Sequence, residues 1–230
     1  MRLFYSKKIN DSFILEGQEC RHISKVLRKK VGDTINLTDG NGYIYIAKIL
    51  HQEKEVIKLE TIEKKPKKKH KYYLHIAISP TKNKDRFEWF LEKSTEIGID
   101  EITPIVCEHS ERKKINLIRC NKILVSAIKQ SAKFHLPKLN NITTFNKFIN
   151  QKFDLNKYIA HCKKDLSLLD VTNKNKKDNL VMIGPEGDFS LIEINNALKN
   201  NYEEISLGNS ILRTETAGVI ATNIIHLTFK

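Results

Sequence analysis

Short runs in the first part of the chain alternate between apolar and polar residues, which is the period of a β-strand. These runs are residues 3–5, 13–15, 34–38, 43–50 and 56–61. The sequence Asp39-Gly40-Asn41-Gly42 separates two of them, and these residue types tolerate the positive φ angles of a tight hairpin turn. Residues 19–29 instead place Ile23, Val26 and Leu27 on one helical face. We therefore expect a small β-barrel with one short basic helix.

Strand-like and helix-like patterns alternate through the rest of the chain. Strands are expected at residues 73–79, 102–107, 157–161, 180–183 and 204–207. Helices are expected at residues 85–97, 118–134 and 216–227. This alternation predicts a parallel sheet covered by helices on both faces, so the fold class is α/β.

A lysine-rich segment, residues 64–71, separates the two patterns. Six of its residues are lysines, and it also contains Pro66. Like charges repel one another and proline disfavours the interior of a strand or helix, so we predict an exposed connector. The chain then divides into residues 1–71 and residues 72–230. The first part carries 17 Lys and Arg against 9 Asp and Glu, and so holds most of the excess positive charge.

The formal net charge of +13 predicts a polyanionic partner, nucleic acid before membrane. A lysine-rich composition caused by A/T-biased codons is the alternative. The 40% of hydrophobic residues can build a core, which excludes wholesale disorder, and no apolar run is long enough to span a membrane. No apolar leader precedes residue 16, so the cytoplasm is the expected compartment. The four cysteines form no Cys-x-x-Cys pair, and no metal is expected.

The nine glycines exclude two common enzyme classes. No G-x-G-x-x-G follows a predicted strand and no P-loop occurs, so neither an ordinary dinucleotide site nor a nucleotide triphosphatase is expected. Two glycine-bearing loops, residues 184–190 and 208–218, follow predicted strands, where ligands bind in open α/β sheets. The alternative for each loop is an ordinary turn into a helix, with Ser190 or Thr214 as N-cap.

The same loops carry a family resemblance. "GPEGDFS" and "LGNSILRTETAGVIA" resemble the signature loops of the RsmE-type 16S ribosomal RNA (uracil-N3)-methyltransferases, which are SPOUT-class enzymes. "RHISKVLRKKVGD", "KNKDRFEWFLEKSTEIGIDEITPI", "SERKKIN" and "KQSAKFHLP" are similar to further blocks of that family, in the same order along the chain. Departures occur at Asp188, Ser210 and Lys133, where the family commonly has Gly, Arg and Arg.

The resemblance implies a PUA-like barrel followed by a SPOUT α/β-knot domain, in which a parallel sheet contains a deep trefoil knot, and a homodimer. It implies S-adenosylmethionine as cofactor and methylation of N3 of one uridine in 16S rRNA of the small ribosomal subunit. Two alternatives remain open: a SPOUT methyltransferase acting on another RNA, and a non-catalytic rRNA-binding protein. The target nucleotide, the general base, and the choice between free rRNA and an assembled subunit are not determined by the sequence.

The site residues follow from the matched blocks and from the chemistry of uridine. Its N3 proton must leave, either to a carboxylate or with help from a cation, so the catalytic candidates are Arg213, Glu215 and Glu186. The expected cofactor-binding residues are Ile183, Gly184, Pro185, Glu186, Gly187, Leu207, Gly208, Asn209, Ile211, Leu212, Thr216 and Ala217. The expected RNA-binding residues are His22, Arg21, Lys25, Arg28, Lys82, Arg86, Arg112 and Lys133, for which a solvated surface is the alternative.

Overall fold

The computed structural model describes residues 2–9, 12–161, 166–172 and 178–229, which form two compact units. The N-terminal unit consists of Met1–Lys69 and Val125–Leu136, and the C-terminal unit of His70–Leu124 and Pro137–Lys230. The first division falls within the lysine-rich segment. The return of residues 125–136 to the N-terminal unit is not visible in the sequence pattern, because it depends on contacts between segments far apart in the chain.

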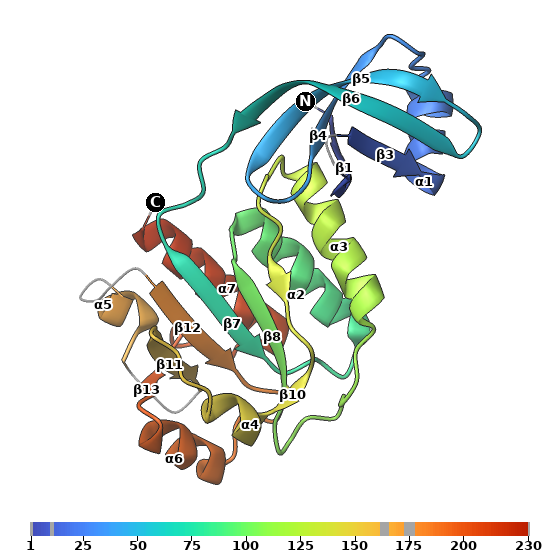
Figure 1. The fold of residues 1–230 in the computed structure, drawn as a ribbon. Helices are drawn as coiled ribbons and strands as arrows, with labels where there is room; N and C mark the ends of the chain where they lie inside the picture. Colours follow the sequence, from blue (N-terminus) through green and yellow to red (C-terminus); the bar gives the residue numbers. More distant parts are fainter. Residues whose placement is uncertain (1, 10–11, 162–165, 173–177, 230) are drawn as a thin grey trace. The chain divides into compact units, whose positions relative to one another are not determined.

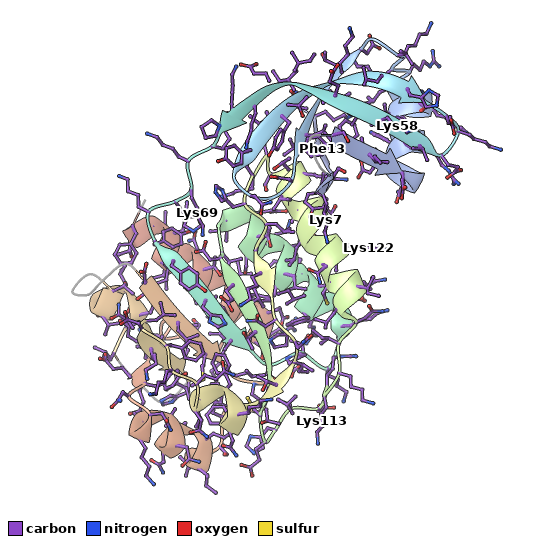
Figure 2. The ribbon with its side chains drawn as sticks, in the orientation of Figure 1. Lys7, Phe13, Lys58, Lys69, Lys113 and Lys122 are labelled. Carbon is purple, nitrogen blue, oxygen red and sulfur yellow. The ribbon has the colours of Figure 1, made fainter. Side chains whose placement is uncertain are left out.

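The N-terminal unit contains a six-stranded sheet in the order β1-β4-β5-β6-β3-β2. All of these strands except β2 are labelled in Figure 1. Its strands are β1 (Leu3–Tyr5), β2 (Lys8–Ile9), β3 (Ser12–Glu16), β4 (Thr34–Thr38), β5 (Tyr43–Gln52) and β6 (Val56–Pro66). The predicted hairpin is confirmed, since β4 and β5 pair antiparallel with Leu37 opposite Tyr45. Apolar side chains from five strands share one core. Phe13 is fully buried in that core, whereas Lys58 is exposed on the outer face (Figure 2).

Two local predictions in this unit were wrong. The connector begins later than expected, because Lys64, Lys65 and Pro66 still pair with β5 as the last residues of β6. Proline is tolerated at a strand end, and the ammonium group of Lys64 lies 3.8 Å from the ring centroid of Tyr43. The basic helix also begins two residues earlier and ends three residues earlier than predicted. It comprises α1 (Gly17–Arg21) and a π-turn (His22–Val26), and it ends before Arg28, whose φ is +53°.

The C-terminal unit contains a seven-stranded sheet in the order β10-β8-β7-β12-β11-β13, with β9 pairing β8. Its strands are β7 (Tyr73–Ile78), β8 (Glu101–Val106), β9 (Lys138–Leu139), β10 (Thr143–Thr144), β11 (Asn156–Ala160), β12 (Asp178–Ile183) and β13 (Glu203–Ile205). Every pairing in it is parallel, which confirms the predicted sheet type. The central strands are buried on both faces, as is usual when helices cover a parallel sheet.

Helices cover this sheet on two sides (Figure 1). The helices of the described chain beyond α1 are α2 (Lys84–Ile97), α3 (Leu117–Gln130), α4 (Phe145–Ile149), α5 (Leu168–Thr172), α6 (Leu191–Lys199) and α7 (Thr214–Thr228). Side chains of α4 and α6 pack in one core with residues of β7, β11 and β12. On the other side, α7 packs against α2 and β7. None of the described helices has the length and apolar composition needed to cross a bilayer.

Gly218 permits the close approach of α7 to α2. A Cβ at this position would lie 2.6 Å from ring carbons of Phe90 and 3.0 Å from Ile78 Cδ1. Phe90 and Ile78 are fully buried and so have little room to move. The glycine therefore sets how near the first turns of α7 come to α2. Glu215 lies in the first of these turns, and Arg213 directly precedes α7.

Candidate functional site

A cavity of about 250 Å³ lies at the ends of three neighbouring strands of the C-terminal unit. The strands β12, β11 and β13 are parallel, so their carboxyl ends meet at one edge of the sheet, where the loops after them diverge. We call this the loop cavity. It is lined by Ala160, His161, Ile183, Gly184, Pro185, Glu186, Asp188, Ser206, Leu207, Gly208, Ser210, Ile211, Leu212, Arg213, Thr214 and Ala217.

Hydrogen bonds tie the lining loops to one another. The hydroxyl of Thr214 donates to the backbone carbonyl of Gly184 at 3.0 Å, which joins the start of α7 to the loop after β12. Glu186 Oε1 accepts from the backbone N–H of Lys82 at 2.9 Å, which joins the same loop to the loop after β7. The Ser206 hydroxyl bonds to both the N–H and the carbonyl of Gly208. The cavity is thus bounded by backbone held in place.

At Gly208 the cavity is lined by backbone without a side chain. The φ of Gly208 is +123°, a conformation that residues other than glycine rarely adopt. A Cβ built on it would meet no protein atom within 4 Å, so the space beside this residue is open. A ligand that fits between the two loops can therefore approach the backbone closely at this residue.

Most of the expected cofactor-binding residues are brought together in the loop cavity. Nine of the twelve line it, and Gly187, Asn209 and Thr216 do not. The carbonyl of Gly187 instead accepts a hydrogen bond from His109 Nδ1, as does that of Asp188. These two bonds raise the pKa of the His109 imidazole above its ordinary value.

Six lining residues were not among the expected cofactor-binding or catalytic residues: Ala160, His161, Asp188, Ser206, Ser210 and Thr214. Ala160 and His161 end a predicted strand, so the rule that ligands bind at carboxyl ends was the signal that pointed to them. His161 is buried and its Nε2 lies 2.9 Å from a carboxylate oxygen of Glu204.

The two helix N-termini behind the glycine loops are built differently. Ser190 is an N-cap, as the alternative interpretation predicted: its hydroxyl accepts from the N–H of Glu193, whose carboxylate accepts from the N–H of Ser190. Thr214 is not a cap, because Arg213 occupies the N-cap position of α7 and the Thr214 hydroxyl is committed to Gly184. At α7 the side chain at the start of the helix therefore joins the two loops that line the cavity, whereas at α6 it caps its own helix.

The three catalytic candidates have different surroundings. Arg213 is exposed, and its guanidinium makes no ion pair within the part of the chain that the structure describes. Glu186 is also exposed, but one of its oxygens is occupied by the Lys82 N–H. The Glu215 side chain is only 8% exposed, its Oε1 lies 3.7 Å from Arg86 Nε, and its Oε2 has no hydrogen-bond partner among the described residues.

The expected RNA-binding residues divide between the two units. The N-terminal unit holds Arg21, His22, Lys25, Arg28 and Lys133. Arg21 and Lys25 line a groove there together with Lys29, Lys30 and Lys54, and Arg21 also pairs with Glu55 at 2.7 Å. Burial lowers the pKa of the Lys133 ammonium group.

Lys82, Arg86 and Arg112 belong to the C-terminal unit. Lys82 is exposed and pairs with Glu111 at 2.8 Å. Arg112 donates to the backbone carbonyls of Thr81 and Lys82, which positions the loop that Glu186 also holds. Arg112 therefore fixes the backbone to which Glu186, a lining residue of the loop cavity, is hydrogen-bonded. Arg86 lies beside Glu215.

Comparison with protein families decides the assignment. The RNA methyltransferase domain matches residues 67–226, and the RNA methyltransferase PUA domain matches residues 15–61. The chain belongs to the RNA methyltransferase family. The expected order of a PUA-like part followed by an α/β methyltransferase domain is thereby confirmed.

Relatives of this family match the chain over nearly its whole length. The ribosomal RNA small subunit methyltransferase E of Buchnera aphidicola is 31% identical, covering 96% of this chain and 90% of its own. A probable rRNA methyltransferase from Porphyromonas gingivalis superposes with a TM-score of 0.91 at 36% identity, covering 100% of this chain and 98% of its own. Ribosomal RNA small subunit methyltransferase E from Neisseria gonorrhoeae, solved with bound S-adenosyl methionine, has a TM-score of 0.85 at 26% identity and covers 96% of this chain and 95% of its own.

Proposed function

We propose that this enzyme transfers a methyl group from S-adenosylmethionine to N3 of a specific uridine in 16S rRNA of the small ribosomal subunit. The loop cavity is the observation that carries the proposal, because its backbone walls and apolar side chains suit an adenosyl group. The names of the full-length relatives support the substrate, and the S-adenosyl methionine in the neisserial neighbour supports the cofactor. A protein that only bound rRNA would gain nothing from this cavity.

The residues of the loop cavity fit the cofactor. The open space beside Gly208 leaves room for part of the cofactor to contact the backbone directly. Ile183, Leu207 and Leu212 provide an apolar lining. The proposed cofactor-binding set is the nine predicted residues in the lining, with Gly187, Asn209 and Thr216 next to them in the chain. When bound, S-adenosylmethionine supplies a methyl group attached to a positively charged sulfur. After the transfer this sulfur is part of a neutral thioether, which is the leaving group.

The reacting uridine needs help from the chain because a neutral imide nitrogen is a poor nucleophile. As N3 takes the methyl group, the N3–H bond must break and its proton must pass to a base. We assign to Arg213 the stabilisation of the negative charge that develops on the uracil oxygens, since it lines the cavity and its guanidinium forms no ion pair with the described residues. Glu215 is the better base of the two carboxylates, because Glu186 already holds the Lys82 loop.

The proposal also covers the oligomeric state of the protein, its cellular compartment and its contacts with RNA. We propose a homodimer that works in the cytoplasm, with S-adenosylmethionine as its cofactor and no metal. The basic side chains of the N-terminal unit, with Lys82 and Arg86 of the C-terminal unit, contact phosphates of the rRNA. Phosphate contacts supply affinity and orientation, while recognition of the base takes place at the reaction site.

The test is mass-spectrometric mapping of modified nucleosides in small-subunit rRNA. A strain lacking the gene should lose one 3-methyluridine, and the gene supplied on a plasmid should restore it. Purified enzyme should then methylate either rRNA or the assembled subunit from the deletion strain, which identifies the substrate form. An unchanged rRNA modification pattern in the deletion strain would exclude the proposed target.

The lysines of the connector should contribute to RNA binding. Lys67, Lys68 and Lys69 are exposed and lie directly after β6, and Lys69 can be found in Figure 2. Replacing all three by glutamine should weaken RNA binding and flatten the dependence of log K on log salt by up to about 2 units, at roughly 0.7 per contacted phosphate. Filter binding at several salt concentrations measures this slope, and affinity for the cofactor should stay the same.

A matched control separates phosphate contact from a general loss of charge. Lys58, Lys122 and Lys199 are also exposed but are scattered over different elements, so their replacement removes the same formal charge. The control variant should keep the wild-type slope. If both triple variants flatten the slope equally, the connector makes no specific contact with RNA.

A further inference from the structure

A second cavity of about 390 Å³ lies between the first turns of α2 and α7. It is lined by Asp85, Arg86, Trp89, Arg213, Glu215 and Thr216, and we call it the α2–α7 cavity. Arg213 lines this cavity and the loop cavity alike. A group held in the α2–α7 cavity therefore lies next to a residue that borders the proposed cofactor site.

Two features of the α2–α7 cavity point to a ligand. The Glu215 side chain is 8% exposed, and its Oε2 has no hydrogen-bond partner among the described residues. An unpaired buried oxygen is costly, so a ligand N–H at this point would be stabilising. Trp89 is 42% exposed, which leaves part of a large aromatic ring uncovered beside this carboxylate. An unpaired acceptor next to an aromatic face suits a nucleobase.

We propose that the α2–α7 cavity receives the uracil of the substrate, with Trp89 stacking on its face and Arg86, Glu215 and Arg213 recognising its hydrogen-bonding edge. This inference rests on the proposed function. It also gives Arg86 a contact with the base in place of the contact with a phosphate proposed above.

The donors and acceptors of the cavity match uracil and oppose cytosine. The edge of uracil presents the acceptor O4, the donor N3–H and the acceptor O2. Guanidinium groups only donate and a carboxylate only accepts, so Arg86, Glu215 and Arg213 offer donor, acceptor and donor. Cytosine would place an amino group against a guanidinium and the N3 lone pair against the carboxylate. Such mismatches leave buried polar groups unpaired, which is the strongest form of discrimination.

Trp89 is positioned for this role by the spacing of α2. It follows Asp85 by four residues and Arg86 by three, so all three side chains share one face of the helix. That face borders α7, whose first turn carries Glu215. Stacking on an aromatic side chain contributes affinity without sequence preference, so Trp89 adds affinity and the charged residues add selectivity.

Trp89 is the only tryptophan of the chain, so its fluorescence measures the proposed stacking directly. Full-length protein saturated with S-adenosylhomocysteine should be titrated with a short oligoadenosine RNA that contains one central uridine, and with the same RNA containing cytidine. The uridine probe should quench the fluorescence saturably, and at least tenfold more cytidine probe should be needed. Equal quenching by both probes, or none by either, would overturn the inference.

Three variants test the separate roles. Trp89→Ala should raise the KM for RNA about 5- to 150-fold, the range expected from base–aromatic stacking, and leave the affinity for S-adenosylmethionine unchanged. Trp89→Phe should recover most of that loss. Glu215→Gln should reduce the preference for the uridine probe at least tenfold, because an amide offers a donor as well as an acceptor. Leu198→Ala, which truncates a side chain that is 40% exposed, is the control and should behave as wild type.

The outcomes distinguish this inference from the proposed function. If rRNA mapping finds no methylation but the uridine probe still binds selectively, the proposed function fails and the uracil cavity stands. If methylation occurs while Trp89→Ala and Glu215→Gln leave KM and the uridine preference unchanged, the uracil lies elsewhere. A Trp89→Ala variant that loses cofactor affinity in the same proportion as RNA affinity would also overturn the inference.

Discussion

Replacing Arg213 by alanine should reduce methyl transfer by at least tenfold while the affinity for S-adenosylmethionine and the stability of the protein remain near wild type. A charge-assisted hydrogen bond to an anionic uracil or a phosphate contributes about 1.5–3 kcal/mol, which corresponds to roughly 10- to 150-fold in rate. The fold should tolerate the change, because the Arg213 side chain does not cap α7 and forms no ion pair with the described residues. Single-turnover kinetics and calorimetry measure the two quantities.

Arg213→Lys is the matched variant for this prediction. Lysine keeps the positive charge but lacks the planar, forked guanidinium, so only part of the lost rate should return. If Arg213→Ala lowers cofactor affinity in proportion to the rate, the guanidinium contacts the cofactor, in keeping with its place in the lining of the loop cavity. If neither quantity changes, the catalytic assignment of Arg213 is incorrect.

Gly208→Val should abolish detectable binding of S-adenosylmethionine by a protein that is still folded. The φ of +123° is unfavourable for a β-branched residue, and the added methyl groups would occupy the open space in which we place the cofactor. Isothermal titration calorimetry measures the affinity, and circular dichroism verifies the fold. An affinity equal to that of the wild type would show that the cofactor binds elsewhere.

Gly32→Val is the matched control for this experiment, because Gly32 has a similar backbone conformation. Gly32 has a φ of +96°, and an added Cβ there would also meet no atom within 4 Å, but the residue lies in the N-terminal unit outside the loop cavity. The two variants share the backbone strain and differ in the space they fill. Loss of cofactor binding in both would mean that strain alone, acting through stability, explains the effect at Gly208.

Local patterns predicted the main elements because they depend on residues close together in the chain. The alternation of apolar residues located β7, β8, β11, β12 and β13 to within a few residues, and the parallel sheet followed from the intervening helices. Errors occurred where a local preference was outweighed. Pro66 was expected to prevent strand pairing, yet it is the last residue of β6 and lies opposite Tyr43, and a strand end is a position where proline is tolerated.

The glycine loops show how far sequence reasoning reached into the site. Residues 184–190 and 208–218 were recognisable because glycines after strands are local signals, and most residues predicted there line the loop cavity. The sequence could not distinguish the role of Ser190 from that of Thr214, since each lies at the start of a helix. The bond from the Thr214 hydroxyl to the Gly184 carbonyl joins residues thirty positions apart. Only the folded structure therefore shows that this hydroxyl connects two loops and does not cap a helix.

The sequence by itself determined the fold class, the family and the loops that border the proposed cofactor site, because each is encoded in contiguous residues. Only the tertiary structure decided which side chains meet. It placed residues 125–136 in the N-terminal unit, joined Glu186 to the Lys82 N–H, and brought Trp89 and Arg86 of α2 to the buried carboxylate of Glu215 on α7. These contacts depend on how helices pack on a sheet, where burial and close approach at Gly218 are set jointly by residues more than a hundred positions apart.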